Sequence, residues 1–197
     1  FEDLYYEGIN VATHADINDE NQTVKYPEIH TTFIDKDTND RFVKVSEYEE
    51  LVDTVTFTNL VPGLTYTVEG TLMIKETGEA LKDSEGNIVT SSRIFVPTTS
   101  SGTVDVVFTF NSSSVASGST LVAFEEIRYE DITFATHTDI ENLPQTVYFP
   151  DIHTTFIDSA TNNQVAASNS KATLIDTFFV FIYLTPLGLL IVTEYES

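Results

Sequence analysis

Four sets of polar residues occur twice in this sequence, always 123 residues apart. The sets are a threonine pair, an aspartate, a glutamate and a His-x-Asp-x5-Gln run: Thr31-Thr32 and Thr154-Thr155, Asp53 and Asp176, Glu2 and Glu125, and His14 to Gln22 with His137 to Gln145. Asp53 interrupts the apolar run LVDTV, and Glu125 directly follows VAF. A carboxylate among apolar side chains needs a partner or its pKa rises. Two carboxylates and a histidine could therefore form an acid–base group around a nucleophile.

Each of these residues also has a plain structural interpretation. An aspartate in a strand, such as Asp53, is commonly an edge or cap residue. His137 could be a hydrogen-bonded surface histidine, and Gln145 could satisfy a loop amide. The repetition of the whole set at one offset favours a shared site over four unrelated structural roles.

The polar set belongs to a longer internal repeat. The segment HADINDENQTVKYPEIHTTFID from His14 recurs from His137 as HTDIENLPQTVYFPDIHTTFID, with 14 of 22 positions identical and no gap. A period of 123 residues is the size of a domain rather than of a solenoid unit. We therefore expect an excerpt of a longer array.

The repeat predicts three parts of the chain. Residues 1–27 would be the end of one repeat, 28–150 a complete repeat, and 151–197 the start of the next. The joints KYPE and YFPD each contain proline, which stiffens a connection. Such an array would be semi-rigid, and its partners would be the neighbouring repeats of the same chain.

The elements of the complete repeat read as short strands separated by turn signals. Strands are predicted at 29–35, 51–60, 64–74, 103–110, 121–129, 132–140 and 145–149, with turns at 61–64 and 85–87. In the run TVDVVFTF, the alternation places Val104, Val106, Phe108 and Phe110 on one face. This pattern predicts an all-β fold, a β-sandwich repeat with partial repeats at both ends.

Composition excludes several classes of function. With 9 basic against 31 acidic residues the formal charge is −22, which argues against nucleic acid and anionic membranes as partners. The absence of cysteine excludes disulfides, thiolate metal sites and cysteine nucleophiles. The apolar run from Phe178 to Thr193 contains Pro186 and Gly188 and is short for a membrane span, so a distorted pair of buried strands is favoured.

The combined motifs resemble a known family of Gram-positive surface repeats, named for a Val-Ala-Phe-Glu motif. That motif stands here as Val122-Ala123-Phe124-Glu125, together with the opening strand IHTTFID and the closing His-x-Asp…Gln-Thr-Val. The resemblance covers 28–150 and both flanking pieces. It implies an immunoglobulin-like, CnaB-like sandwich in the stalk of an adhesin or pilus-like protein, extracellular and anchored to the cell wall.

The resemblance also implies a self-formed ester cross-link, made once per domain, and no cofactor, metal or turnover. By this resemblance Thr31 is the nucleophile and Gln145 the acceptor, and His137 is the base. Asp53 and Glu125 would polarise the amide carbonyl and hold the site in order, with one of the two kept protonated by burial. Glu2, His14 and Gln22 in the first piece, and Thr154 and Asp176 in the last, would be partial sites that form no bond by themselves.

The choice between the two threonines of the first strand rests on alternation. Ile29, Thr31 and Phe33 share one face, whereas Thr32 lies on the other. If the apolar pair faces the core, Thr31 does so too, and we expect it to be the nucleophile.

Four other interpretations remain open from the sequence. A Lys–Asn bond is disfavoured because Lys36 lies after the strand. A calcium loop at 16–21, DINDEN, lacks the glycine and final glutamate of an EF-hand. A Thr–His–Asp hydrolase would need an open cleft, and a plain sandwich spacer would carry no cross-link.

Overall fold

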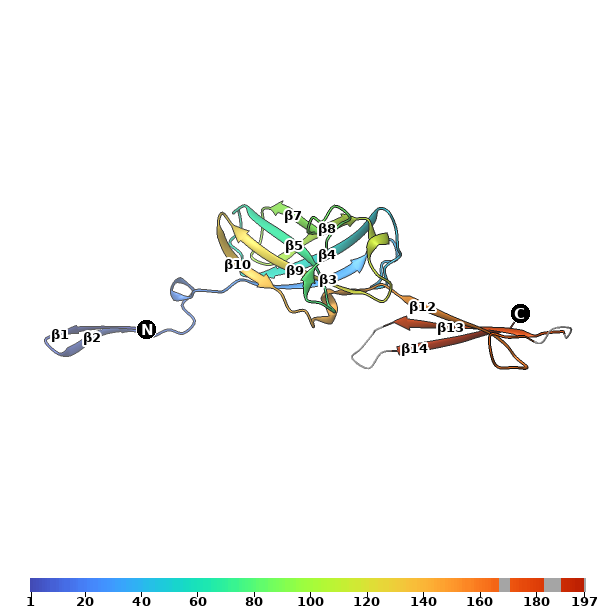
Figure 1. The fold of residues 1–197 in the computed structure, drawn as a ribbon. Coiled ribbons are helices and arrows are strands. Elements are labelled where there is room, and N and C mark those ends of the chain that lie inside the picture. The colour runs from blue at the N-terminus through green and yellow to red at the C-terminus, as the bar shows by residue number, and fades with distance from the viewer. Residues whose placement is uncertain (167–170, 183–188, 197) are drawn as a thin grey trace.

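The computed structural model describes residues 1–166, 171–182 and 189–196. It is built of β-strands and three short 3-10 helices (Figure 1). The strands before and within the central part are β1 (Glu2–Tyr6), β2 (Ile9–His14), β3 (Glu28–Asp35), β4 (Glu49–Thr58), β5 (Tyr66–Ile74), β6 (Glu79–Ala80), β7 (Thr90–Phe95), β8 (Gly102–Phe110), β9 (Thr120–Tyr129), β10 (Ile132–His137) and β11 (Thr146–Tyr148). The last three strands are β12 (Asp151–Asp158), β13 (Leu174–Ile182) and β14 (Leu189–Glu196). The 3-10 helices are η1 (Glu20–Gln22), η2 (Ser112–Ser114) and η3 (Leu143–Gln145).

Strands β3 to β11 form a β-sandwich. One sheet has the order β3-β4-β8. The other has the order β10-β9-β5-β6, with β7 also pairing β5 and β11 also pairing β9. Alternating apolar residues point inward from both sheets, and the whole buried cluster comes from residues 29–149. The predicted all-β sandwich is therefore confirmed.

The two strands β10 and β11 occupy successive stretches of the same edge of β9. His137 of β10 lies opposite Glu125, whereas Thr146 of β11 lies opposite Val122. The helix η3 fills the interval between β10 and β11. From the other sheet, the edge strand β3 contacts β10, η3 and β11, so the two sheets meet along this side of the sandwich.

The strand β7 was not predicted from the sequence. Its segment TSSRIF is exposed or half-buried throughout and lacks an apolar alternation. It is held by its backbone ladder to β5 and by a hydrogen bond of 2.6 Å from the Ser91 hydroxyl to the Val107 carbonyl. The predicted turns at 61–64 and 85–87 are present, where Gly63 and Gly86 have φ of 83° and 88°.

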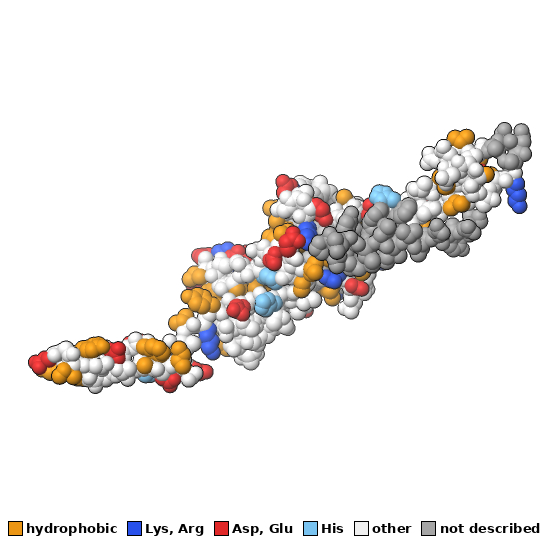
Figure 2. Space-filling view, turned by 90° about the horizontal axis from the view of Figure 1, so that it is seen from below, with side chains coloured by type: hydrophobic (Ala, Val, Ile, Leu, Met, Phe, Trp, Pro, Cys, Tyr) orange, Lys and Arg blue, Asp and Glu red, His pale blue; other side chains and the backbone are white. Residues whose placement is uncertain are grey.

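The flanking parts repeat pieces of the sandwich. The hairpin β1–β2 has the pairing of β9–β10, and β12–β13 has the pairing of β3–β4. Hydrophobic side chains lie on the surface of the hairpin, at the left of Figure 2, including Leu4, Tyr5 and Ile9. Such exposure is expected of a two-stranded sheet.

The apolar run near the end of the chain forms strands β13 and β14, which pair with each other. Pro186 and Gly188, where the distortion of the strand pair was predicted, lie outside the described residues. No helix in the described residues is long and apolar enough to cross a membrane.

Candidate functional site

Thr31 lies on the edge strand β3 with its side chain directed into the sandwich. Its exposed fraction is 4%, and its neighbours on the same face, Ile29 and Phe33, are buried as well. Thr32 points to the opposite face and is exposed. The alternation argument for the orientation of Thr31 is confirmed.

Asp53 comes from β4, the central strand of the same sheet. It pairs with Phe33 on one side and Val106 on the other, and its exposed fraction is 0%. It is therefore neither an edge residue nor a cap. An aspartate this deep in an apolar sheet is costly unless its surroundings compensate it.

Glu125 and Gln145 face this group from the other sheet. Glu125 of β9 is 1% exposed, and Gln145 at the end of η3 is 0% exposed. The Gln145 Nε2 donates to Glu125 Oε2 over 2.8 Å and more weakly to the His137 carbonyl over 3.4 Å. Because β3 contacts η3, the inter-sheet space holds Thr31 and Asp53 from one sheet and the acid–amide pair from the other.

Burial separates the protonation states of the two carboxyls. Burial and, after it, the neighbouring Asp53 raise the pKa of Glu125 to about 11. Burial also raises the pKa of Asp53, but only to about 6, because the Glu125 carboxyl and the Thr31 hydroxyl beside it lower it. At neutral pH, Glu125 is therefore a neutral acid and Asp53 a carboxylate, which is the pattern of an acid–base pair.

His137 lies at the end of β10, where the site reaches the edge of the sandwich. Its ring makes an edge-on contact with His30 at 5.9 Å, and its Nε2 lies 3.2 Å from Asn142 Nδ2. Partial burial lowers the pKa of His137, His30 lowers it further, and Asp139 opposes the shift. A histidine kept neutral in this way can accept a proton.

The site gathers polar atoms that make no hydrogen bond of ordinary geometry. Among the described residues these buried, unpartnered atoms are Thr31 Oγ1, both Asp53 carboxyl oxygens, Glu125 Oε1, His137 Nδ1, Asn142 Oδ1 and Gln145 Oε1. The Thr31 hydroxyl is close enough to affect the pKa of Asp53 without meeting that geometry. Unpartnered groups are uncommon in protein interiors, so their concentration at one place points to a reactive arrangement.

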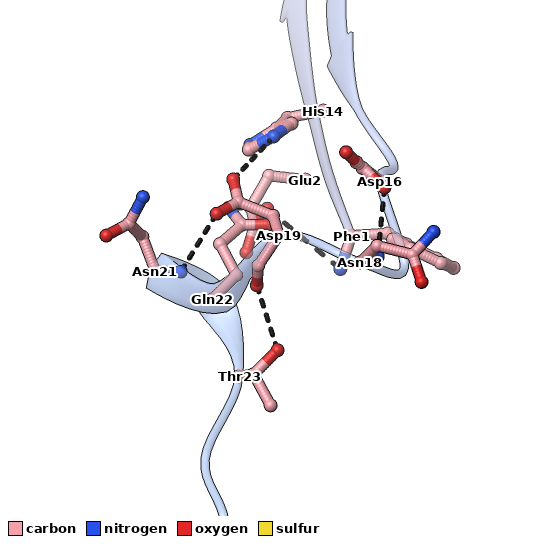
Figure 3. Close-up of polar contacts among 9 residues, drawn as sticks. All are labelled: Phe1, Glu2, His14, Asp16, Asn18, Asp19, Asn21, Gln22 and Thr23. Atoms are coloured by element: carbon pink, nitrogen blue, oxygen red, sulfur yellow. Dashed lines mark hydrogen bonds and ion pairs between the residues drawn. The ribbon is translucent and has the colours of Figure 1, made fainter.

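The first flanking piece contains half of the same site (Figure 3). Glu2 lies opposite His14 in the β1–β2 ladder, and Gln22 Nε2 donates to Glu2 Oε2 over 2.8 Å, as in the complete site. His14 Nε2 forms an ion pair of 3.0 Å with Asp19 Oδ2. All of these residues except Asp19 are exposed.

The last flanking piece carries the other half. Asp176 of β13 pairs with Phe156 as Asp53 pairs with Phe33, and Thr154 stands two residues before Phe156 on β12. Both Thr154 and Asp176 are exposed. The residues predicted for the partial sites thus lie in two separate groups, one in each flanking piece.

The acidic loop at 16–21 uses its carboxylates locally. Asp16 accepts from the Asn18 backbone N–H over 2.9 Å, and Asp19 accepts from that of Asn21 over 2.9 Å. In the described part of the chain, no group of three or more His, Cys, Asp or Glu is placed to hold a metal ion.

Three residues near the site were not singled out from the sequence. Asn142 contacts the histidine, Arg41 Nη1 donates to the Leu143 carbonyl over 2.9 Å, and Lys75 Nζ pairs with Glu141 at 2.9 Å. Arg41 and Lys75 hold the segment that leads into Gln145. The repeat offset aligns Asn142 with Asp19, but the two differ in residue type and so did not belong to the repeated set.

A solved structure supports the fold. A bacterial adhesin from Mobiluncus mulieris, described as containing intramolecular disulfide, isopeptide and ester bond cross-links, is 12% identical with a TM-score of 0.57, and the match covers 79% of this chain and 80% of that one. A second crystal form of that adhesin gives 12% identity and a TM-score of 0.49 over the same shares. Among curated proteins, none shows significant similarity to the chain.

A family model matches most of the chain in two successive copies. The family is described as the T-Q ester bond containing domain, and the matches cover residues 1–26 and 27–149. Its name states the pair of residue types that the buried site brings together, a threonine and a glutamine. The chain belongs to the T-Q ester bond domain family.

Proposed function

We propose that residues 28–150 form one complete repeat that closes an ester bond between Thr31 and Gln145. The observation that carries this proposal is the buried, inter-sheet grouping of Thr31, Asp53, Glu125 and Gln145, in which Gln145 already contacts Glu125 at 2.8 Å. Water is kept from this space, so an amide held beside a hydroxyl there reacts with the hydroxyl rather than with solvent.

The reaction forms one bond and breaks one bond. Thr31 Oγ1 attacks the side-chain carbonyl carbon of Gln145, the C–N bond to Nε2 breaks, and the hydroxyl proton leaves with the nitrogen as part of ammonia. Neither an oxidant nor a cofactor is consumed. The product contains no free amide, so each site reacts once.

The acid–base roles follow from the separated protonation states. Glu125, neutral at pH 7, donates a hydrogen bond to the Gln145 carbonyl once the amide turns about its Cγ–Cδ bond, which exchanges Oε1 and Nε2. The developing charge on that oxygen is then stabilised by a preorganised donor. Asp53 holds Glu125 and the Thr31 hydroxyl in place, and His137 takes the hydroxyl proton and returns it to the departing nitrogen.

The bond would serve a mechanical role in an extracellular stalk. Thr31 lies on the first strand of the repeat and Gln145 directly precedes the last, so the link joins the points where force would enter and leave. We infer a stalk domain of a bacterial surface adhesin, anchored to the cell wall, from the family, the tandem copies and the fold shared with the Mobiluncus mulieris adhesin. Without the link, the roughly 110 residues between the two positions could extend by about 400 Å under load.

Digestion followed by tandem mass spectrometry tests the bond. The 197-residue chain should yield one branched peptide that joins the Thr31 segment to the Gln145 segment. Thr31→Ala should abolish this peptide, and the matched control Thr32→Ala should retain it. Loss of the branched peptide in Thr32→Ala but not in Thr31→Ala would overturn the assignment of the nucleophile.

The stalk role has its own measurement. When single molecules are pulled from both ends, the wild-type chain should show no extension from the segment between Thr31 and Gln145. Thr31→Ala should release that length, and full extension of the linked wild type would contradict the mechanical role.

A further inference from the structure

The two copies of the histidine contact differ in one residue. In the complete repeat, His137 Nε2 faces the side-chain amide of Asn142 at 3.2 Å. In the preceding copy, His14 Nε2 faces the carboxylate of Asp19 at 3.0 Å. Both contacts span five residues, and Asn142 and Asp19 occupy equivalent positions of the repeat, each as the N-cap of a 3-10 helix.

The carboxylate of Asp19 admits only one arrangement of protons. A carboxylate accepts hydrogen bonds and cannot donate them, so His14 must carry its proton on Nε2. Its Nδ1 is then free to accept a proton whenever the ring is neutral. Figure 3 shows this contact at the end of the hairpin.

Asn142 admits two arrangements, and only one of them is reactive. When Asn142 Nδ2 donates, His137 Nε2 accepts and the ring proton sits on Nδ1, which then cannot act as a base. When the amide is turned, Oδ1 accepts from Nε2–H and Nδ1 is free. His137 Nδ1 and Asn142 Oδ1 are both buried without a partner, and the turned amide would pair the carbonyl oxygen and free Nδ1.

We propose that Asn142 is the positioning residue that sets which ring nitrogen of His137 carries the proton, and that its difference from Asp19 makes the complete repeat close its ester bond more slowly than an aspartate would. The proposal rests on the ester bond proposed above. Asn142 contacts neither reacting atom, so it acts through His137. An aspartate would fix the reactive tautomer at all times and stabilise the imidazolium that forms, as the acidic member of a triad does.

Whether position 142 carries an asparagine or an aspartate also sets the pH below which His137 is protonated and the reaction stops. The titratable groups that face His137 are His30 of β3, Glu125 of β9 and Asp139 of the loop after β10, of which Glu125 is neutral. A carboxylate at position 142 would add a negative charge in hydrogen-bond contact with the ring. Opposite charge at this distance favours the protonated ring, so the base would be lost at a higher pH than with asparagine.

The rate of bond closure in Asn142→Asp and Asn142→Leu tests the proposal. Each 197-residue chain is recovered from inclusion bodies in urea, checked by mass to be unlinked, refolded by dilution across a pH series and quenched in acid. The fraction that has lost one ammonia is followed by intact mass. Asn111→Asp is the matched control, because it introduces the same charge at the N-cap of another 3-10 helix, η2.

Asn142→Asp should close faster at its plateau, with the acid limb of its pH–rate profile moved up by about one unit. Asn142→Leu should close at least about tenfold more slowly, part of the 10²–10⁴ that a positioned base contributes. The control should match the wild type in both respects. Equal plateau rates and acid limbs in wild type and Asn142→Asp would overturn the inference, whereas a wild type that folds without losing ammonia would overturn the ester bond itself.

The tautomer provides a second readout. In the unlinked Thr31→Ala chain, long-range nitrogen–proton NMR of the His137 ring should show the ring proton at least partly on Nδ1, because Asn142 can donate to Nε2. When Asn142→Asp is added to that chain, the proton should lie on Nε2 alone, since a carboxylate only accepts. The same distribution of the proton in both chains would overturn the positioning role of Asn142.

Discussion

Replacing Thr31 by valine should remove the cross-link while keeping the shape of the core. The Thr31 hydroxyl is buried and makes no hydrogen bond of ordinary geometry, so its exchange for a methyl group costs the native packing little. The bond from Thr31 to Gln145 closes a loop of roughly 110 residues, and in the loop-entropy account such a loop stabilises the folded state by about 5 kcal/mol. For a domain of this size that corresponds to a fall in Tm of about 15–25 °C.

Thermal unfolding followed by circular dichroism measures this difference. Wild type and Thr31→Val are compared at the same pH, and mass spectrometry establishes that the first is linked and the second is not. Thr32→Val is the matched control, since it changes an exposed side chain on the opposite face of the same strand and should remain linked. If Thr31→Val melts within a few degrees of a linked wild type, closing this loop does not stabilise the folded state by the expected amount.

Three further predictions concern the acid, the packing and the pH dependence of the site. Glu125→Leu keeps a side chain of similar size but removes the hydrogen-bond donor, so bond closure should slow by roughly 10²–10³-fold in the same mass assay; an unchanged rate would exclude Glu125 as the donor. Gly70→Ala would place a methyl group 2.5 Å from Phe108 Cζ, and should lower the free energy of unfolding in urea by about 1–3 kcal/mol; an unchanged midpoint would show that the ring moves freely. The unlinked valine variant should be less stable at pH 8 than at pH 5, because the pKa of Glu125 is raised from 4.5 to about 11 and the folded state therefore holds a proton that the unfolded state releases. The contribution of Glu125 to the free energy of unfolding is complete below the unfolded pKa and falls by about 1.4 kcal/mol per pH unit between the unfolded and the folded pKa. Glu49, whose pKa is raised to about 7, acts in the same direction. Equal urea midpoints at the two pH values would contradict a protonated Glu125.

The sequence predicted those features that depend on repetition and alternation. The constant offset identified the polar set, and strand alternation placed Thr31 on the buried face although Thr32 is chemically identical. Both rules act locally along the chain, so they need no knowledge of the sheet order. The buried face of β8, with Val104 and Phe108, follows from the same alternation.

Features set by contacts between distant strands could not be predicted in this way. The strand β7 has no apolar pattern from which it could be predicted. It forms because its backbone pairs with β5 at the edge of the sheet. Which of the two carboxyls, Asp53 or Glu125, keeps its proton depends on how the two sheets meet, and the spacing of residues in the sequence does not give this. In the sequence Gly70 is indistinguishable from any other glycine in a strand. Only the structure shows that Phe108 of the other sheet lies too close to it for a side chain to fit.

Asn142 shows a limit of the repeat comparison itself. The offset aligns it with Asp19, yet the two differ in type, so a search for identical residues passes over them. Only the contact of each with its histidine shows that the two positions have a common role.

The intact mass of the denatured 197-residue chain shows whether the bond between Thr31 and Gln145 has formed. We predict a mass lower than that of the sequence by one ammonia, because within the described residues Thr31 and Gln145 are the one threonine and glutamine placed together in a buried site with both carboxyls. A mass equal to that of the full sequence, in protein shown by circular dichroism to have been folded before denaturation, would contradict the ester bond.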